Sequence, residues 1–456
     1  MFMILSDNFR FLILKFFNRR KMTEKNNKKT IFGWSLYDWA KSAYETTTLG
    51  AILPVYFVSV VVPSEGFNFR GNLYTGAEVW GFAIGSALFI FFLIMPTIGA
   101  IGDLSGNRMK LFKIFAYGGA VFASTFYFAT SGDVIFTLGI YFLAQFGATG
   151  SNVFYDSVLK DITTDDTIDA VSARGYALGY LGGGLQLVIS LALIQLGPDL
   201  LGIETELASR IAISSAGLWW LVFSMMSFSR MKITENKSIS VEGNIFANAY
   251  SKNFKTLKKI RQFPFLMYFL IAYLFYWDGL QTIINMSGAY FSEVILLDQT
   301  QIIMVFIVVQ FVAYFGAKLA GVMAKRIGQK NTLYYTMFLI FIVGNAAAFI
   351  PEKQFLPVIA LGVFTAMGMG GLQSVSRSVY ASMLPKGAEG EFMGFFSVLS
   401  RFSAIWGPLI YSYVSVTTGN PRLSLPVITS FFVIGFLILR KVDMDKTISE
   451  DEWASI

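Results

Sequence analysis

Charged residues stand inside several long apolar stretches of this chain, and the first stretch holds the densest group of them. Asp38, Lys41 and Glu45 lie within residues 31–60. Their spacing of three and four residues places them on one face of a helix, where neighbouring side chains can pair. Each charge costs about 2.5–3.5 kcal/mol at the centre of a membrane helix, so this face is expected to contact protein or water instead of lipid.

Polar residues occur at similar depth in other apolar stretches. Asp278, Gln281 and Asn285 have the same spacing as the first group. The remaining candidates for substrate or proton binding are Asn152, Arg377 and Arg401. The charges of six candidates sum to zero, namely Asp38, Lys41, Glu45, Asp278, Arg377 and Arg401. These residues are therefore expected to line a net-neutral cavity for a solute or protons; the alternative is an ion-pair network that only holds helices together.

Three further polar residues have less specific interpretations. Lys318 and Asp156 lie near predicted helix ends, where a long or polar side chain can reach the membrane interface. Gln145, like Asn152, either lines the cavity or bridges two helices.

Carboxylates are the expected proton carriers, and Glu45 and Asp278 are the best candidates because burial disfavours the charged form of a carboxyl group. The chain contains no histidine and no cysteine, which removes imidazole proton carriers, thiol nucleophiles, disulfides and the common zinc ligands. The sequence shows no convincing nucleophile–base pair and no phosphate-binding GxxxxGK[ST] loop. We therefore predict that the protein is not an enzyme and binds no cofactor or metal.

The composition identifies the elements that must position these residues. Of 456 residues, 55% are hydrophobic and 14% are charged, whereas a soluble domain carries about 25% charge. Apolar stretches of about 18 residues or more recur, and each can cross a bilayer of about 30 Å as a helix. We predict an all-α polytopic membrane protein with twelve spans, at 31–60, 79–101, 110–130, 134–157, 173–197, 209–229, 264–291, 300–324, 332–350, 356–384, 391–415 and 424–440.

Basic residues concentrate in alternate loops, which predicts the orientation of the chain in the membrane. With both termini cytoplasmic, the basic residues predicted on the opposite side are Arg70, Arg210, Lys353 and Arg422. The net charge of +7 then reflects topology, not a surface for nucleic acid.

The predicted organisation is a cytoplasmic tail at 1–30, a six-helix bundle at 31–229, a cytoplasmic linker at 230–263 with a surface helix near 250–261, a second six-helix bundle at 264–440, and a tail at 441–456. Met22 is an alternative start to Met1, and no cleaved signal peptide is expected.

One loop sequence occurs twice, at the same place in each predicted bundle. Residues 99–108 read GAIGDLSGNR and residues 321–330 read GVMAKRIGQK. Gly106 is expected to take a positive φ in a tight turn, and Gly99 to let a neighbouring helix approach closely. Asp103 can accept hydrogen bonds from a helix N-terminus or pair with Arg108. The duplication favours a loop that controls conformation over a plain helix hairpin, although Lys325 replaces the aspartate in the second copy.

Glycines support the same internal repeat. Gly147 and Gly150 match Gly368 and Gly371 at an offset of 221 residues. Two parallel halves of six helices are typical of major facilitator transporters, whose substrate sites lie between the halves near the bilayer midplane. We expect the first, fourth, seventh and tenth spans to line the cavity, with Arg401 added from the eleventh.

Three segments carry a resemblance to a known family. WSLYDWAKSAY (34–44), SARGYALGYLGGG (172–184) and GGLQSVSRSVYASMLP (370–385) resemble the autophagy-related, vacuole-effluxer-like family of the major facilitator superfamily. The resemblance covers about residues 31–440. It implies the major facilitator fold with two pseudo-symmetric bundles, and amino acids as the substrate class, because the family's named member type is implicated in amino-acid export from vacuoles. The loop at 99–108 is similar to the superfamily's loop signature, which implies that Gly99, Asp103, Gly106 and Arg108 govern the switch between outward- and inward-open states.

The sequence thus predicts a secondary active transporter that moves a small polar solute, with amino acids as the candidate class, by alternating access and with proton coupling. The alternative is a non-transporting receptor or scaffold on the same fold, which would bind partners through the linker or the tails. The expected partners are a small-molecule substrate, the lipid bilayer and protons, without nucleic acid. We expect a monomer in a bacterial plasma (inner) membrane.

Overall fold

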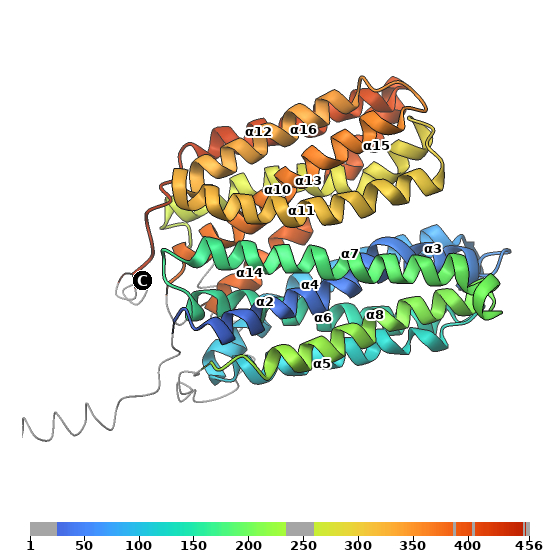
Figure 1. The fold of residues 1–456 in the computed structure, drawn as a ribbon, viewed down its shortest axis with the longest axis horizontal. Helices are drawn as coiled ribbons and strands as arrows, with labels where there is room; N and C mark the ends of the chain where they lie inside the picture. The colour runs from blue at the N-terminus through green and yellow to red at the C-terminus, as the bar shows by residue number, and fades with distance from the viewer. Residues whose placement is uncertain (1–24, 234–259, 386–388, 404–405, 450–451, 453–456) are drawn as a thin grey trace, which may run out of the picture.

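The computed structural model describes residues 25–233, 260–385, 389–403, 406–449 and 452. Long helices run roughly side by side along the molecule (Figure 1). Among the described residues, nine helices are long and apolar enough to cross a membrane. The predicted spans at 264–291, 332–350 and 391–415 are not among the nine, so the total of twelve stays a prediction. The predicted N-terminal tail, most of the linker and its surface helix lie outside the described residues.

The helix boundaries agree with the predicted spans to within five residues at every end. The first half of the chain forms α2 (Lys28–Ala43), η1 (Tyr44–Ile52), α3 (Leu53–Tyr56), η2 (Phe57–Val61), α4 (Gly76–Ser105), α5 (Arg108–Ser124), η3 (Thr125–Phe128), α6 (Val134–Ile162), α7 (Ile168–Leu201) and α8 (Thr205–Phe228). The second half forms α10 (Pro264–Glu293), α11 (Gln299–Ile327), α12 (Gln329–Ala347), α13 (Phe355–Met383), α14 (Glu389–Ser403), α15 (Trp406–Thr418), η4 (Pro421–Leu423) and α16 (Ser424–Leu439).

The first and third predicted spans are not entirely α-helical, and the third ends in the 3-10 helix η3. The first span contains the π-helical segments η1 and η2, and such segments are frequent at functional sites. In the eleventh span the structure describes α14 and α15, and residues 404–405 between them lie outside the described part of the chain.

The helices form two groups that lie against each other. In the first bundle, α2 to α8, α2 packs on α7 and α8, and α5 packs on α6 and α8. In the second bundle, α10 to α16, α10 packs on α16, and α13 packs on α11 and α12. Across the interface α7 contacts α11 and α13, and α14 contacts α4 and α6. Figure 1 shows most of the second bundle above the first, with α14 at the level of α2 and α7.

The glycines of the internal repeat allow matching helix contacts in the two bundles. A Cβ atom on Gly147 of α6 would lie 2.4 Å from the Cα of Gly119 in α5. A Cβ atom on Gly368 of α13 would lie 2.6 Å from the Cγ1 of Ile340 in α12. Both distances are too short for a side chain, so these glycines let the third and fourth helices of each half pack closely, as small residues do in membranes.

A short β-hairpin, which the sequence did not predict, follows η2. Strand β1 (Phe67–Phe69) pairs antiparallel with β2 (Asn72–Tyr74). Between them, Arg70 and Gly71 have φ angles of 53° and 85°, as the two-residue turn of a hairpin requires. This hairpin marks one end of the molecule, called here the hairpin end. The opposite end, where α8 ends and α10 begins, is called the linker end.

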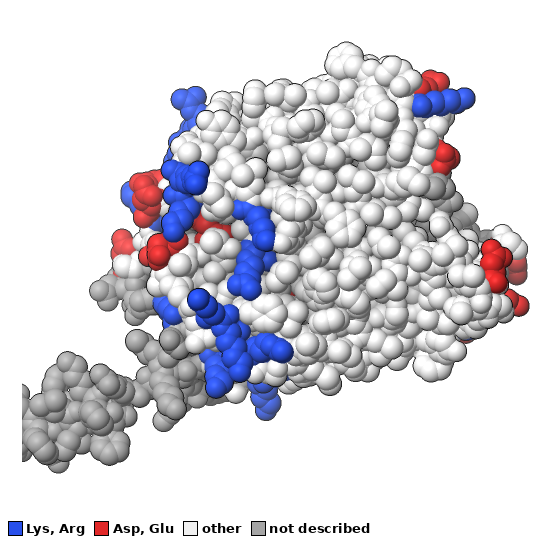
Figure 2. All heavy atoms as spheres, in the orientation of Figure 1, with Lys and Arg blue, Asp and Glu red and all other residues white. Residues whose placement is uncertain are grey.

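Charged side chains gather at the two ends of the visible face, and the region between them is almost entirely uncharged (Figure 2). Lysine and arginine predominate at the linker end, on the left of the view. A wide uncharged belt is the surface that a bilayer requires.

Candidate functional site

A cavity of about 530 Å³ lies between the two bundles. It is lined by three carboxylates and two cations among the described residues, namely Asp38, Glu45, Asp156, Lys41 and Arg377. The neutral polar lining includes Gln145, Asn152, Gln281, Asn285, Gln310 and Gln373. Aromatic residues complete the wall, among them Tyr176, Tyr180, Tyr273 and Trp277. Both signs of charge and several amides therefore face one space of small-molecule size.

Arg377 of α13 is the centre of the charged lining and is 2% exposed. Its Nη1 lies 3.4 Å from Oδ2 of Asp38 and 3.3 Å from Oδ1 of Asp156. Its Nε donates to the hydroxyl of Ser172 at 3.1 Å, and its Nη2 donates to the carbonyl of Ser172 at 2.8 Å. One guanidinium thus joins the second bundle to α2, α6 and α7 of the first.

Aromatic rings surround this guanidinium. Its carbon lies 4.1 Å from the ring centroid of Tyr176, 5.0 Å from that of Trp34 and 5.4 Å from that of Tyr155, within the range of cation–π attraction. A Cβ atom on Gly175 would lie 2.8 Å from Nη2 of Arg377. Only glycine at position 175 leaves room for the guanidinium. None of these four residues is predicted at the site from the sequence pattern.

The prediction for Asp156 is wrong. It was expected near a helix end, reaching toward the interface, but α6 continues to Ile162 and the carboxylate faces Arg377. A sequence signal for this pair exists, because Asp156 and Arg377 are 221 residues apart, the offset that relates Gly147 to Gly368. They therefore occupy equivalent positions in the two halves, where α6 and α13 meet.

Lys41 forms a second group in the cavity. Its Nζ lies 3.0 Å from Oε2 of Glu45 and 2.5 Å from Oδ1 of Asn152. The predicted pairing of neighbours on one helical face is confirmed. The Glu45 side chain is 34% exposed, whereas that of Lys41 is 5% exposed. Glu45 is thus accessible from the cavity while its partner is buried.

Asp278 does not belong to the described lining of the cavity, unlike Gln281 and Asn285. Its carboxylate accepts a hydrogen bond from the N–H of Gly407 at 3.0 Å and lies 3.5 Å from the hydroxyl of Thr282. This hydrogen bond joins α10 to α15 within the second bundle. The predicted role of Asp278 in proton transfer stays a prediction.

Arg401 lies on α14, but its side chain is outside what the structure describes. Its predicted place in the cavity stays a prediction.

The loop at 99–108 has the predicted turn. Gly106 and its counterpart Gly328 have φ angles of 63° and 84°, as expected for the eighth position of both copies. Gly99 is buried in α4. A close helix approach occurs one turn later, because a Cβ atom on Gly102 would lie 2.4 Å from Cε1 of Phe154.

Arg108 is bound by three carboxylates at the linker end. Its Nη2 lies 2.8 Å from Oδ2 of Asp161, its Nη1 lies 3.6 Å from Oε2 of Glu389, and its Nε lies 3.9 Å from Oδ1 of Asp103. The predicted pair of Asp103 and Arg108 is confirmed. Asp161 and Glu389 were not predicted, and Glu389 belongs to α14 of the second bundle. The loop therefore connects the two bundles through charge.

Other hydrogen bonds close the linker end across the interface. Ser172 donates to the carbonyl of Ser374 at 2.7 Å. Gln329 of the second loop donates to Asp169 at 2.7 Å, and Lys160 donates to the carbonyl of Leu384. The central cavity is thus separated from the linker end, whereas Asn285 near its other side is exposed.

Comparison with known proteins identifies the family. Residues 160–452 match the sequence model of the family described as "Vacuole effluxer Atg22 like". The chain belongs to this Atg22-like family. It is 31% identical over 421 residues to the "Uncharacterized MFS-type transporter YxiO" of Bacillus subtilis, covering 92% of this chain and 95% of that relative. Autophagy-related protein 22 of Cryptococcus neoformans is 27% identical over 306 residues, covering 63% of this chain and 55% of the fungal protein.

Solved structures agree with the fold of this Atg22-like chain. The human organic anion transporter MFSD10 superposes with a TM-score of 0.61 at 15% identity, covering 91% of this chain and all of that one. FucP in the outward conformation superposes with a TM-score of 0.67 at 14% identity, covering 91% and 98%. The predicted major facilitator fold is confirmed, and the protein is an integral membrane transporter of this superfamily.

The hydrogen bond between Asp278 and Gly407 gives a test at this site. Asp278→Asn keeps an oxygen that can accept from Gly407, so we expect little change in thermal stability and transport. Asp278→Ala leaves the buried N–H without this acceptor and is expected to cost about 1–3 kcal/mol of stability. Thermal unfolding in detergent measures the difference. If Asp278→Asn instead folds normally and loses proton-driven transport, Asp278 is a proton carrier, as first predicted.

Proposed function

We propose that this Atg22-like transporter moves a small zwitterionic solute, with amino acids as the favoured class, by alternating access and with proton coupling. The observation that carries the proposal is the pairing of Lys41 with Glu45 and Asn152 at the wall of the cavity. A zwitterion can separate this ion pair, with its ammonium group bound by Glu45 and its carboxylate by Lys41. The exchange leaves no buried charge unpaired, which would otherwise be costly.

Neutral groups near this pair suit the rest of such a solute. Gln281, Asn285 and Gln373 supply amide donors and acceptors from the second bundle, while Tyr176 and Trp277 offer apolar surface. Binding sites for small molecules usually combine apolar walls with a few placed polar groups. A solute that contacts Glu45 and Gln281 together touches both bundles, which favours coupling of binding to their relative movement.

Alternating access then requires the linker end to open while the other side closes. Opening would separate Arg377 from its partners in the first bundle and Arg108 from Glu389. The family description "Vacuole effluxer Atg22 like" supports export as the direction. The concentration of basic residues at the linker end supports cytoplasmic termini, and the Bacillus relative supports a bacterial plasma membrane. We treat the monomer as the transporting unit.

A ligand screen tests the proposed substrate class. Purified full-length protein is heated with amino acids, with the matching amines and carboxylic acids that lack one charge, and with sugars and nucleosides. We expect stabilisation only by zwitterions, of about 2.7 kcal/mol when the ligand is at 100 times its Kd. Stabilisation by single-charge analogues or sugars to the same extent would contradict the proposal.

The proton-coupling hypothesis is tested at Glu45. In proteoliposomes, we expect Glu45→Gln to reduce pH-gradient-driven accumulation of the identified solute at least tenfold, since the amide carries no proton into the cycle. Solute exchange without a gradient should persist, although weakened, because Lys41 and Asn152 remain. Asp278→Asn is the matched control, as it removes one carboxylate outside the described cavity lining. Wild-type gradient dependence in Glu45→Gln would favour uniport.

A further inference from the structure

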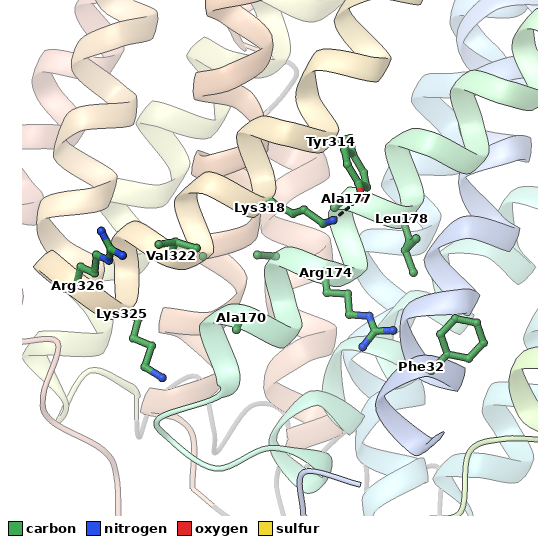
Figure 3. Close-up of a pocket in the computed structure, with 12 residues that line it drawn as sticks. Phe32, Ala170, Arg174, Ala177, Leu178, Tyr314, Lys318, Val322, Lys325 and Arg326 are labelled. Carbon is green, nitrogen blue, oxygen red and sulfur yellow. Dashed lines mark hydrogen bonds between the residues drawn. The ribbon is translucent and has the colours of Figure 1, made fainter. Parts of the chain in front are cut away.

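A second cavity, of about 680 Å³, lies near the linker end between α2, α7 and α11. It shares no described residue with the central cavity. Four cations line it, namely Arg174, Lys318, Lys325 and Arg326. Figure 3 shows Arg174 extending from α7 toward Phe32 and Lys318 extending from α11 toward Tyr314. We call this cavity the α7–α11 groove.

Small residues form the walls of the groove. Ala170, Ala173 and Ala177 lie along one face of α7 and line it together with Gly321 of α11. A Cβ atom on Gly321 would lie 2.7 Å from the Cβ of Ala173, so the two helices nearly touch at its floor. Val322, 50% exposed, forms part of the outer wall. The result is a narrow apolar channel with room for a chain of methylene groups.

The described lining of the groove contains no carboxylate beside its four cations. Among the described residues, none of them forms an ion pair with a carboxylate within 4.0 Å. Arg174 lies 5.6 Å from the ring centroid of Phe32, and Lys318 lies 4.4 Å from that of Tyr314, whose hydroxyl accepts its hydrogen bond. The pKa of Asp166 is lowered, mainly by the hydroxyl of Thr164, and Lys325 contributes to that shift. The described lining of the groove is therefore positively charged, although Asp166 lies close enough to interact with Lys325.

Lys318 and Arg174 lie well inside their helices, away from the helix ends at the membrane surface. Lys318 lies nine residues before the end of α11 at Ile327, which is about 13 Å along the helix. Arg174 lies six residues after the start of α7 at Ile168, which is about 9 Å. Cations at such depth on a lipid-facing surface are costly unless an anion pairs with them. Basic pockets between membrane helices are a recognised way of binding acidic lipid head groups.

We propose that the α7–α11 groove binds one anionic phospholipid. Arg174 and Lys318 hold its phosphate, Lys325 and Arg326 strengthen the positive field, and an acyl chain lies between Ala170 and Val322. A phospholipid fits better than a water-soluble anion because Leu319 and Phe315, the neighbouring residues of α11, are 47% and 64% exposed apolar side chains on the same belt. The lipid would contact both bundles at once, since α7 and α11 belong to different ones.

Native mass spectrometry of the full-length protein tests this binding. The protein is titrated with phosphatidylglycerol and, separately, with phosphatidylcholine of the same acyl chains. We expect one phosphatidylglycerol bound at low concentration and no comparable phosphatidylcholine. Arg174→Gln with Lys318→Gln should weaken phosphatidylglycerol binding about 30-fold, or about fivefold for each cation. The matched control, Lys110→Gln with Lys113→Gln, removes two exposed charges from α5 at the same end and should bind as wild type.

Two further arms complete the test. Val322→Trp keeps all four cations but fills the channel from an exposed position, so it should no longer bind phosphatidylglycerol. This variant keeps the proposal testable even if the double glutamine variant does not fold. Glycerol phosphate, which has the head-group anion without acyl chains, should not compete at equal concentration. The proposal is overturned if glycerol phosphate competes fully, if phosphatidylcholine binds equally, or if Val322→Trp and the α5 control bind alike.

Discussion

Arg377→Gln is expected to abolish transport and to lower the free energy of unfolding by about 3–5 kcal/mol, the cost of removing one partner from a buried ion pair. The guanidinium holds two carboxylates, Asp38 and Asp156, and makes two hydrogen bonds to Ser172. Glutamine can replace at most part of these interactions and leaves the carboxylates facing each other. Thermal unfolding and solute uptake in proteoliposomes measure the two effects.

A double variant that removes one charge of each sign distinguishes loss of a local ion pair from general misfolding. Arg377→Gln combined with Asp156→Asn removes one charge of each sign, so we expect the double variant to regain part of the lost stability. Asp156→Asn alone should be milder than Arg377→Gln, because Arg377 keeps Asp38 and Ser172. Lys232→Gln, at an exposed position, is the control for loss of one positive charge. Strict additivity of the two substitutions would show that the residues do not interact.

Arg377→Lys distinguishes charge from shape at the same position. Lysine keeps the charge but lacks the planar group that contacts Ser172 through two nitrogens and packs on Tyr176. Arginine and lysine are not equivalent where several donors or a stacked ring are used. We expect a folded protein with transport reduced at least tenfold. Transport at the wild-type rate would show that only a positive charge is needed.

The sequence was sufficient for much of the fold because its signals are local. Apolar length and loop composition predicted the helix ends, and the duplicated glycines predicted the two halves. Spacing on one helical face predicted that Lys41 pairs with Glu45. These inferences depend on distances along one helix, which the 3.6-residue period determines.

Contacts between helices were harder to predict. Burial of Asp278 was expected, but its hydrogen bond with Gly407 depends on how α10 packs against α15. Asp156 was misplaced because α6 extends five residues beyond the predicted end of the span. Glu389 was overlooked because it stands outside every predicted span, at the start of α14, and nothing local indicates that α14 reaches the first loop. The repeat offset shared by Asp156 and Arg377 is a long-range signal that relates these two residues within the sequence.

The charge cluster around Arg108 lies at the linker end, whereas Arg377 lies at the central cavity. One guanidinium serves three carboxylates, and the side chains of Asp103 and Glu389 are 2% and 4% exposed. Removal of the cation leaves like charges together in a region that is largely shielded from water. The closed arrangement of the linker end would then lose a cross-bundle attraction and gain a repulsion.

We therefore expect Arg108→Gln to favour opening of the linker end by about 2–5 kcal/mol, the range for truncating one member of a buried charge pair at an interface. The chain has no native cysteine, so a single Ser374→Cys reporter, at a buried cross-bundle position, can be labelled with a maleimide without background. Labelling should become at least tenfold faster in Arg108→Gln and remain unchanged in the control Lys110→Gln, an exposed neighbour on the same helix. The double variant Arg108→Gln with Glu389→Gln should be labelled more slowly than Arg108→Gln alone. It removes the repulsion between the Glu389 carboxylate of the second bundle and the carboxylates of the first. Equal labelling rates with and without Arg108 would mean that this loop is a hairpin with no control over the closed state.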